Sequence, residues 1–235
     1  MEIVGTEPPS VERIAERLAR LQARLERAAE DNGHDPAALR IVAVTKGHPV
    51  EVVKRAVASG LRLLGENRIQ EAEPKIAALP EVEWHLIGTL QSNKARRAVG
   101  GFGVIHSIDS VELLRRVVVI AAEEGRRPRL LLQVNVSGEA SKQGLAPQML
   151  EAANLVDAAR EGQIVGLMTI APMGASAEEA RTVFARLRGL RDRLQAATGI
   201  PMPELSMGMS ADAEAAAAEG ATLVRIGTAL FGPRP

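Results

Sequence analysis

The sequence contains no cysteine and no tyrosine among its 235 residues. The absence of cysteine excludes disulfides, thiolate nucleophiles and cysteine metal ligands. The absence of tyrosine excludes a phenol as a catalytic acid or base. Lysine is scarce as well, because only five of the 29 basic residues are lysines and the others are arginines. Any chemistry that needs a primary amine therefore has few candidates.

The chain also lacks an excess of either charge and any long apolar run. Its 29 basic and 29 acidic residues give a net charge of zero. A nucleic-acid or anionic membrane surface requires a basic excess, so we expect neither partner. Apolar runs such as 117–122 are too short to span a bilayer. The first ten residues, MEIVGTEPPS, lack the basic and apolar regions of a secretory signal, and we expect a cytoplasmic protein.

Strand and helix patterns alternate regularly after a long amphipathic helix at 10–33. The predicted strands are 41–45, 61–65, 83–87, 104–108, 130–136, 164–168, 204–206 and 222–226. The predicted helices are 50–59, 68–79, 91–99, 110–124, 147–160, 177–197 and 213–220. Eight such units with short loops indicate parallel strands joined by helical crossovers. The pattern predicts an α/β fold, a single (β/α)8 TIM-type barrel forming one domain over 1–235, with helix 10–33 packed outside it.

Functional residues of such barrels lie at the carboxyl ends of the strands. Lys46 follows the first strand and shares the alternation of Val42 and Val44, so its amine could be partly desolvated. A desolvated lysine has a lowered pKa and forms imines with carbonyl compounds. The alternative is a lysine that simply reaches into solvent. The other lysines are weaker candidates. Lys54 and Lys75 fall on solvated helix faces, whereas Lys94 at a helix start and Lys142 in a loop lie on the rim but not on a strand.

Small-residue turns end the seventh and eighth strands, at 206–208 and 227–228. Such turns leave backbone N–H groups available, and barrels often bind phosphate there. Without a ligand they are only turns, and Ser210 or Asp212 serves as the cap of helix 213–220. No metal-binding spacing is visible among the four histidines, which we expect to be structural: His34, His48, His85 and His106.

A series of motifs in order along 41–232 resembles one family: AVTK, GENRIQE, WHLIGTLQSNK, QVNVSGEASKQG, GLMTI, LSMGMSADAEAA and VRIGTALFG. Together they are similar to the pyridoxal-phosphate homeostasis proteins, which have an alanine-racemase N-terminal-domain-like barrel. The resemblance implies that Lys46 holds pyridoxal 5′-phosphate as an internal aldimine. It further implies phosphate contacts from Ser206, Gly208, Gly227 and Thr228, ring contacts from Asn67 and Met168, and Arg225 against the pyridine nitrogen. The chain departs from the family pattern at Gly47, Leu64 and Ala213.

The resemblance implies a role in vitamin B6 homeostasis, without catalytic residues or defined turnover. We expect a monomer that passes its cofactor to B6-dependent apoenzymes. One alternative is a fold-type III amino-acid racemase, which needs a tyrosine on an added β domain. With no tyrosine, and with the sequence ending three residues after Gly232, we expect no such domain. Another alternative is a Schiff-base aldolase for sugar phosphates, which would lack the cofactor and its visible absorption.

Overall fold

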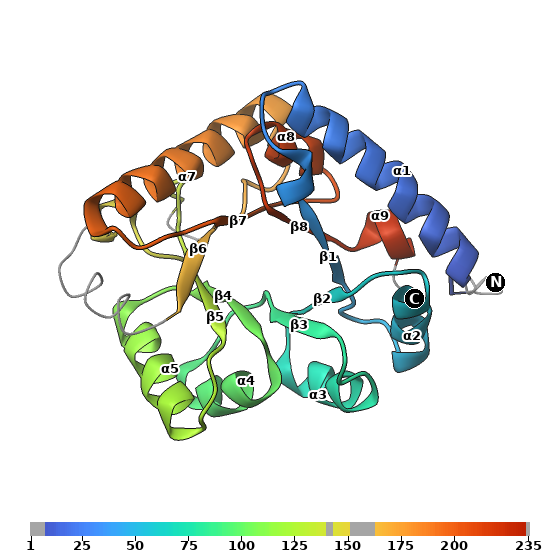
Figure 1. Ribbon diagram of the computed structural model, residues 1–235, viewed down its shortest axis with the longest axis horizontal. Coiled ribbons are helices and arrows are strands. Elements are labelled where there is room, and N and C mark those ends of the chain that lie inside the picture. Colours follow the sequence, from blue (N-terminus) through green and yellow to red (C-terminus); the bar gives the residue numbers. More distant parts are fainter. Residues whose placement is uncertain (1–7, 140–142, 151–162, 234–235) are drawn as a thin grey trace.

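A ring of strands surrounded by helices is the main feature of the computed structural model, which describes residues 8–139, 143–150 and 163–233 (Figure 1). Eight parallel strands pair in chain order, and β1 pairs with β8 to close the barrel. The strands are β1 (Arg40–Val44), β2 (Leu63–Glu66), β3 (Glu83–Leu86), β4 (Val104–Ile108), β5 (Arg129–Gln133), β6 (Ile164–Met168), β7 (Glu204–Met209) and β8 (Leu223–Ile226). The predicted (β/α)8 fold is confirmed.

Helices cover the outside of this ring (Figure 1). They are α1 (Val11–Glu30), α2 (Val50–Ala58), α3 (Ile69–Ala78), α4 (Ala95–Gly101), α5 (Val111–Glu123), α7 (Ala177–Thr198), α8 (Ala213–Ala218) and α9 (Thr228–Phe231), with 3-10 turns at Pro36–Ala38, Ser92–Lys94 and Pro147–Met149. Most of the helix predicted at 147–160 lies outside the described residues. No helix in the described ranges has both the length and the apolar character needed to cross a membrane.

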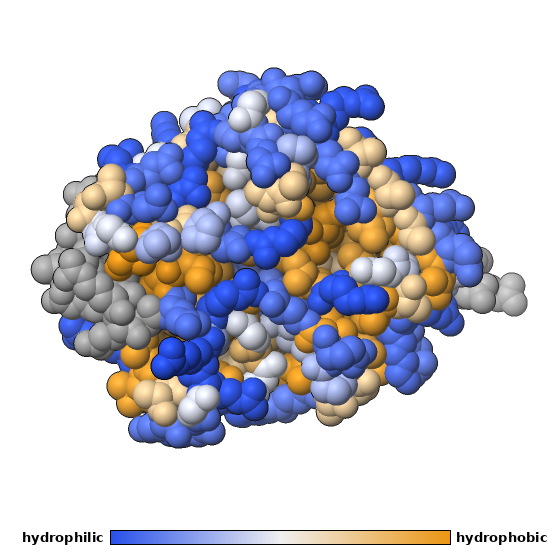
Figure 2. Space-filling model, in the orientation of Figure 1, coloured by the Kyte–Doolittle hydropathy of each residue, from blue (hydrophilic) through white to orange (hydrophobic). Residues whose placement is uncertain are grey.

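The extra helix α1 precedes the first strand and lies outside the barrel. Its first turn is capped by Ser10, whose side chain accepts the Arg13 N–H at 3.3 Å. Its buried residues form one stripe, Ile14, Leu21, Leu25 and Ala29, which faces α2, α8 and α9. The remaining face of α1 is charged, and Figure 2 shows that the outer edge of the molecule is mainly hydrophilic in this view. The amphipathic pattern therefore predicted the helix correctly.

Apolar side chains form two layers, one on each side of the strands. A small cluster fills the barrel interior: Val42, Val104, Leu131, Met168 and Leu223. A much larger one lies between the strands and the helices. Strands of a parallel barrel are buried on both faces, so their sequences are almost continuously apolar. The polar exceptions on these strands are consequently the residues that need an explanation.

Candidate functional site

Lys46 lies at the carboxyl end of β1, as its sequence position predicts. Lys46 is half-buried. It occupies a tight turn in which the His48 N–H donates to the Thr45 carbonyl at 3.1 Å. The end of β8 adjoins this turn, because a Cβ added to Gly227 would lie 3.5 Å from the Cβ of Val44. Lys46 and the Gly227–Thr228 turn therefore share one part of the barrel rim.

The prediction that Lys75 lies on a solvated helix face is wrong, because only 3% of the residue is exposed. Its Nζ donates to Glu66 Oε1 at 2.6 Å, to Glu71 Oε1 at 3.0 Å and to the Thr45 carbonyl at 2.9 Å. All three N–H groups of the ammonium are therefore satisfied. The four-residue spacing of Glu71 and Lys75 is equally typical of an exposed helix pair, so it does not reveal this burial.

Two carboxylates share the Lys75 charge and differ in their pKa. Burial raises the pKa of Glu66, although its hydrogen bonds from Lys75 and Thr45 oppose the change. For Glu71, burial also acts to raise the pKa, but the Gly47 N–H and Lys75 outweigh it and the pKa is lowered. Among the described residues, Glu66 Oε2 has no hydrogen-bond partner. This cluster of buried Glu66 and Lys75 with half-buried Glu71 is named the acidic clamp below.

The acidic clamp fixes the backbone on both sides of Lys46. Thr45 Oγ1 donates to Glu66 Oε1 at 2.6 Å, and the Gly47 N–H donates to Glu71 Oε1. Gly47 has a φ of 75°, in the left-handed region that favours glycine. This conformation gives a physical reason for glycine at a position where the chain departs from the family pattern. Lys46 is thus presented from an anchored turn.

Arg225 is a buried cation on β8, with 4% of its surface exposed. Its Nη1 donates to Ser206 Oγ at 2.6 Å and its Nη2 donates to the Thr169 carbonyl at 2.9 Å. Burial lowers the pKa of Arg225 to about 10, and the charge of Asp212 opposes this change. No carboxylate in the described part of the chain forms an ion pair with it. A buried charge without a counter-ion is costly, so this position suits a ligand that accepts hydrogen bonds.

The two serines near the end of β7 occupy different environments. Ser206 is fully buried, and its Oγ contacts His106 Nδ1 at 2.8 Å as well as Arg225. Ser210 is exposed at the rim, where its Oγ accepts the Ala229 N–H at 3.3 Å. The sequence offered Ser210 only as a helix cap, and no pattern distinguished it as a rim residue beside the turn after β8. The phosphate contact of Ser206 stays a prediction.

The two predicted glycine turns also differ. Gly208 has a φ of 86°, and a Cβ there would lie 2.5 Å from the Cβ of Ala216, so packing against α8 by itself requires glycine. At Gly227 a side chain would meet only ordinary contact distances. Thr228, which follows it, is exposed. The turn after β8 therefore has room for an approaching ligand, whereas packing alone accounts for Gly208.

Asn67 and Met168 lie at different depths. Asn67 lines a cavity of about 340 Å³ at the carboxyl ends of β2, β3, β5 and β6. Gly88 allows this approach, since a Cβ there would be 2.3 Å from the Asn67 carbonyl oxygen. Met168 is 1% exposed and belongs to the apolar cluster inside the barrel, level with Ser206 on β7. Lys46 and Asn67 therefore lie at the rim of the barrel, whereas Met168 lies deeper in its interior.

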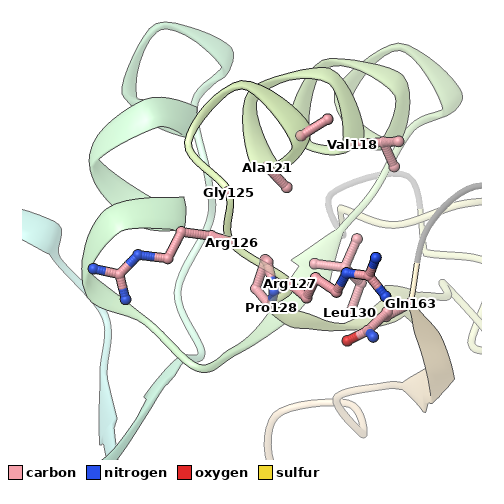
Figure 3. Close-up of a pocket in the computed structure, with 9 residues that line it drawn as sticks. Val118, Ala121, Gly125, Arg126, Arg127, Pro128, Leu130 and Gln163 are labelled. Carbon is pink, nitrogen blue, oxygen red and sulfur yellow. The ribbon is translucent and has the colours of Figure 1, made fainter.

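A second cavity, of about 580 Å³, lies between α5 and the start of β5 (Figure 3). It is lined by Val118, Ala121, Ala122, Gly125, Arg126, Arg127, Pro128, Leu130 and Gln163. None of the predicted site residues belongs to this set. Figure 3 shows the Arg126 and Arg127 side chains extending in different directions, so they do not converge on one anion. The candidate site is accordingly the carboxyl end of the barrel.

Comparison with known proteins identifies relatives of this chain. A family model for the alanine racemase N-terminal domain matches residues 13–235. The pyridoxal phosphate homeostasis protein of Pseudomonas aeruginosa is 45% identical over 94% of this chain and 96% of its own length. That of Aquifex aeolicus is 40% identical over 93% of this chain and 97% of its own length. PipY of Synechococcus elongatus, in a structure with PLP bound, is 43% identical with a TM-score of 0.81, over 93% of this chain and all of that one. The chain therefore belongs to the pyridoxal phosphate homeostasis protein family.

Proposed function

We propose that this protein binds pyridoxal 5′-phosphate covalently through Lys46 and serves vitamin B6 homeostasis without a defined turnover. The observation that carries the proposal is that an anchored lysine at the end of β1 and a buried arginine on the paired strand β8 lie toward one end of the barrel, and that no carboxylate among the described residues forms an ion pair with the arginine. The relatives' names and the cofactor in PipY support the same ligand. We further propose a cytoplasmic monomer of one domain that supplies B6-dependent apoenzymes.

The donor set fits the functional groups of this cofactor. The primary amine of Lys46 forms a covalent bond with an aldehyde carbon, and water leaves. Arg225 has only hydrogen-bond donors, which suits the lone pair of an aromatic nitrogen. Asn67 and Met168 border the ring in this arrangement. The aldehyde, the ring and its nitrogen thus each have a chemically matched partner.

The phosphate is assigned to the turn after β8 and to Ser210. Gly227 and Thr228 offer backbone N–H groups, and Thr228 adds a hydroxyl. Ser210 is included because its hydroxyl lies at the same rim, on the Ala229 N–H. Ser206 is the weaker phosphate ligand of the two serines, because its Oγ already contacts Arg225 and His106. Charge-assisted hydrogen bonds of this kind contribute about 1.5–3 kcal/mol each.

The absence of turnover follows from the same residues. When bound, pyridoxal phosphate supplies a ring that accepts electrons from a substrate carbanion. Arg225 leaves the ring nitrogen unprotonated, and an unprotonated ring accepts electrons poorly. With no tyrosine in the sequence, we assign Lys46 as the candidate base. Binding is therefore favoured over catalysis.

Borohydride reduction followed by peptide mapping tests the covalent link. The protein incubated with pyridoxal phosphate should absorb visible light, and reduction should fix the cofactor to the peptide that contains Lys46. Lys46→Ala should abolish both signals. Lys54→Ala is the matched control, because Lys54 is an exposed lysine paired with Glu51. An adduct mainly at Lys94 or Lys142 would contradict the assignment.

Exchange of the α-proton tests the lack of turnover. L-Alanine in heavy water should exchange its α-proton no faster with the loaded protein than with free cofactor. Chirality is followed in the same samples. Rapid exchange with inversion that disappears in Lys46→Ala would show that this is an enzyme.

A further inference from the structure

Five polar side chains form one hydrogen-bonded row through the barrel interior, named the polar chain here: Glu83, His85, His106, Ser206 and Arg225. Glu83 Oε1 lies 2.8 Å from His85 Nε2, and His85 Nδ1 lies 2.8 Å from His106 Nε2. His106 Nδ1 then lies 2.8 Å from Ser206 Oγ, the acceptor of the Arg225 bond. In the barrel order β4 and β7 are not neighbours, so the link from His106 to Ser206 spans the interior.

The direction of every bond in the polar chain follows from its two ends. A guanidinium can only donate, and a carboxylate can only accept. Burial lowers the pKa of His85 and of His106, so both rings are neutral, with one N–H each. His85 then donates from Nε2 to Glu83 and accepts at Nδ1 from His106 Nε2. His106 in turn accepts at Nδ1 from the Ser206 hydroxyl.

The reverse direction would leave polar groups unsatisfied. It would place a lone pair of neutral His85 against the Glu83 carboxylate. It would also leave the hydroxyl proton of Ser206, which is fully buried, without an acceptor among the described residues. Buried polar atoms without partners cost free energy. The head-to-tail arrangement that starts at Arg225 and ends at Glu83 satisfies every member.

The polar chain also connects two ends of the barrel. Glu83 is the first residue of β3, where it is about one-third exposed and forms an ion pair with Arg129 at 2.5 Å. Arg225 lies near the opposite end, two residues before the Gly227 turn. Aligned hydrogen bonds polarise one another, so a negative charge at one end strengthens acceptance at the other. The buried cation and a distant carboxylate are thereby coupled.

We infer that the polar chain is a positioning device in which Glu83 acts, through His85, His106 and Ser206, as the remote counter-charge of Arg225. The polar chain orients the guanidinium through its bond to Ser206, and the N–H groups that are not used by Ser206 and Thr169 can donate to a ligand. A carboxylate placed directly on Arg225 would compete with that ligand. The role of Arg225 toward the pyridine nitrogen rests on the proposed function, whereas the direction of the polar chain does not.

Nitrogen NMR of the full-length protein without added cofactor tests the direction. Long-range imidazole correlations should show His85 and His106 both neutral with the proton on Nε2, and both protons should exchange slowly with water. Signals are assigned with His34→Gln and His48→Gln, which remove the other two histidines. A proton on Nδ1 of either neutral ring, or an imidazolium, would overturn the inference. No variant of the polar chain is needed for this measurement.

Solvent exchange of the Arg225 guanidinium protons tests the coupling. Glu83→Gln keeps an acceptor for His85 but removes the charge, so exchange should accelerate about fivefold, the effect of weakening one charge-assisted bond. Glu73→Gln is the control, because it breaks the surface ion pair with Arg97 and leaves Glu83 untouched, so exchange should stay at the wild-type rate. Equal exchange in the wild type, Glu83→Gln and Glu73→Gln would overturn the coupling. If the wild type fails to bind pyridoxal phosphate, the proposed function fails, yet these two readouts still decide the inference.

Discussion

Two buried cations lie on opposite sides of the same barrel wall, and their partners differ. Lys75 contacts two carboxylates, Glu66 and Glu71, and all its N–H groups are used. Arg225 contacts a hydroxyl and a carbonyl, and the hydrogen bonds that lead from it through Ser206 reach a carboxylate at Glu83. The charge of Lys75 is balanced within the protein and contributes to stability. The charge of Arg225 remains available to a ligand, which is the expected property of a binding residue.

Lys75→Met should have the largest effect on stability, because it leaves two carboxylates without their cation. Breaking one partner of a buried ion pair costs about 3–5 kcal/mol. Chemical denaturation of the variant measures this loss. The control Lys54→Met removes an exposed lysine and should change stability by less than about 0.5 kcal/mol. A similar small change in both variants would show that the acidic clamp is not stabilising.

Arg225→Met should weaken binding and should cost less stability than Lys75→Met. The variant leaves Ser206 and the Thr169 carbonyl without a hydrogen bond from the guanidinium, but it also removes the desolvation cost of a buried cation. Affinity for pyridoxal phosphate should fall about 10- to 100-fold, equivalent to one charge-assisted contact. Equilibrium binding and denaturation are measured on the same preparation. A large loss of stability with unchanged affinity would place Arg225 with Lys75 as a structural residue.

Ser206 in β7 and Ser210 just after it test the difference between the interior and the rim of the barrel. Ser210→Ala should weaken pyridoxal phosphate about tenfold while leaving phosphate-free pyridoxal unaffected, because one phosphate contact is lost. Ser206→Ala should weaken both vitamers alike, because it disturbs Arg225 and not the phosphate. Titration of each variant with the two vitamers gives the ratio of its affinities for pyridoxal phosphate and pyridoxal. A selective loss of pyridoxal phosphate affinity in Ser206→Ala, with Ser210→Ala affecting both vitamers alike, would assign the phosphate contact to Ser206.

Glu83 should contribute a small, pH-dependent part of stability. The hydrogen bond from His85, with the charge of Arg129, lowers the pKa of Glu83 from 4.5 to about 2 against the opposing effect of burial. A lowered carboxyl pKa adds stability above about pH 4.5 that is lost as pH falls toward 2. Because Glu83 is about one-third exposed, solvent screening reduces this to about 1 kcal/mol. Unfolding of Glu83→Gln between pH 2 and 7 should lack this component; an unchanged pH profile would contradict it.

The barrel and Lys46 were predictable because their signals are local. Parallel strands buried on both faces read as apolar runs, and Lys46 stands directly after one of them. The acidic clamp and the polar chain were not predictable in this way. Glu66 and Lys75 are close in sequence but look like ordinary surface residues, and His106 meets Ser206 from 100 positions away. Only the closed barrel shows which of these groups lie against one another.

The most direct test of the contrast between the two cations is the nitrogen NMR signal of isotope-labelled pyridoxal phosphate bound to the protein. If the guanidinium of Arg225 faces the ring, the pyridine nitrogen should be unprotonated and hydrogen-bonded from pH 6 to 9. Arg225→Met should lose that hydrogen bond, whereas Lys54→Met should leave the signal unchanged. A protonated pyridine nitrogen in the wild type near neutral pH would contradict the assignment of Arg225 and the non-catalytic role that depends on it.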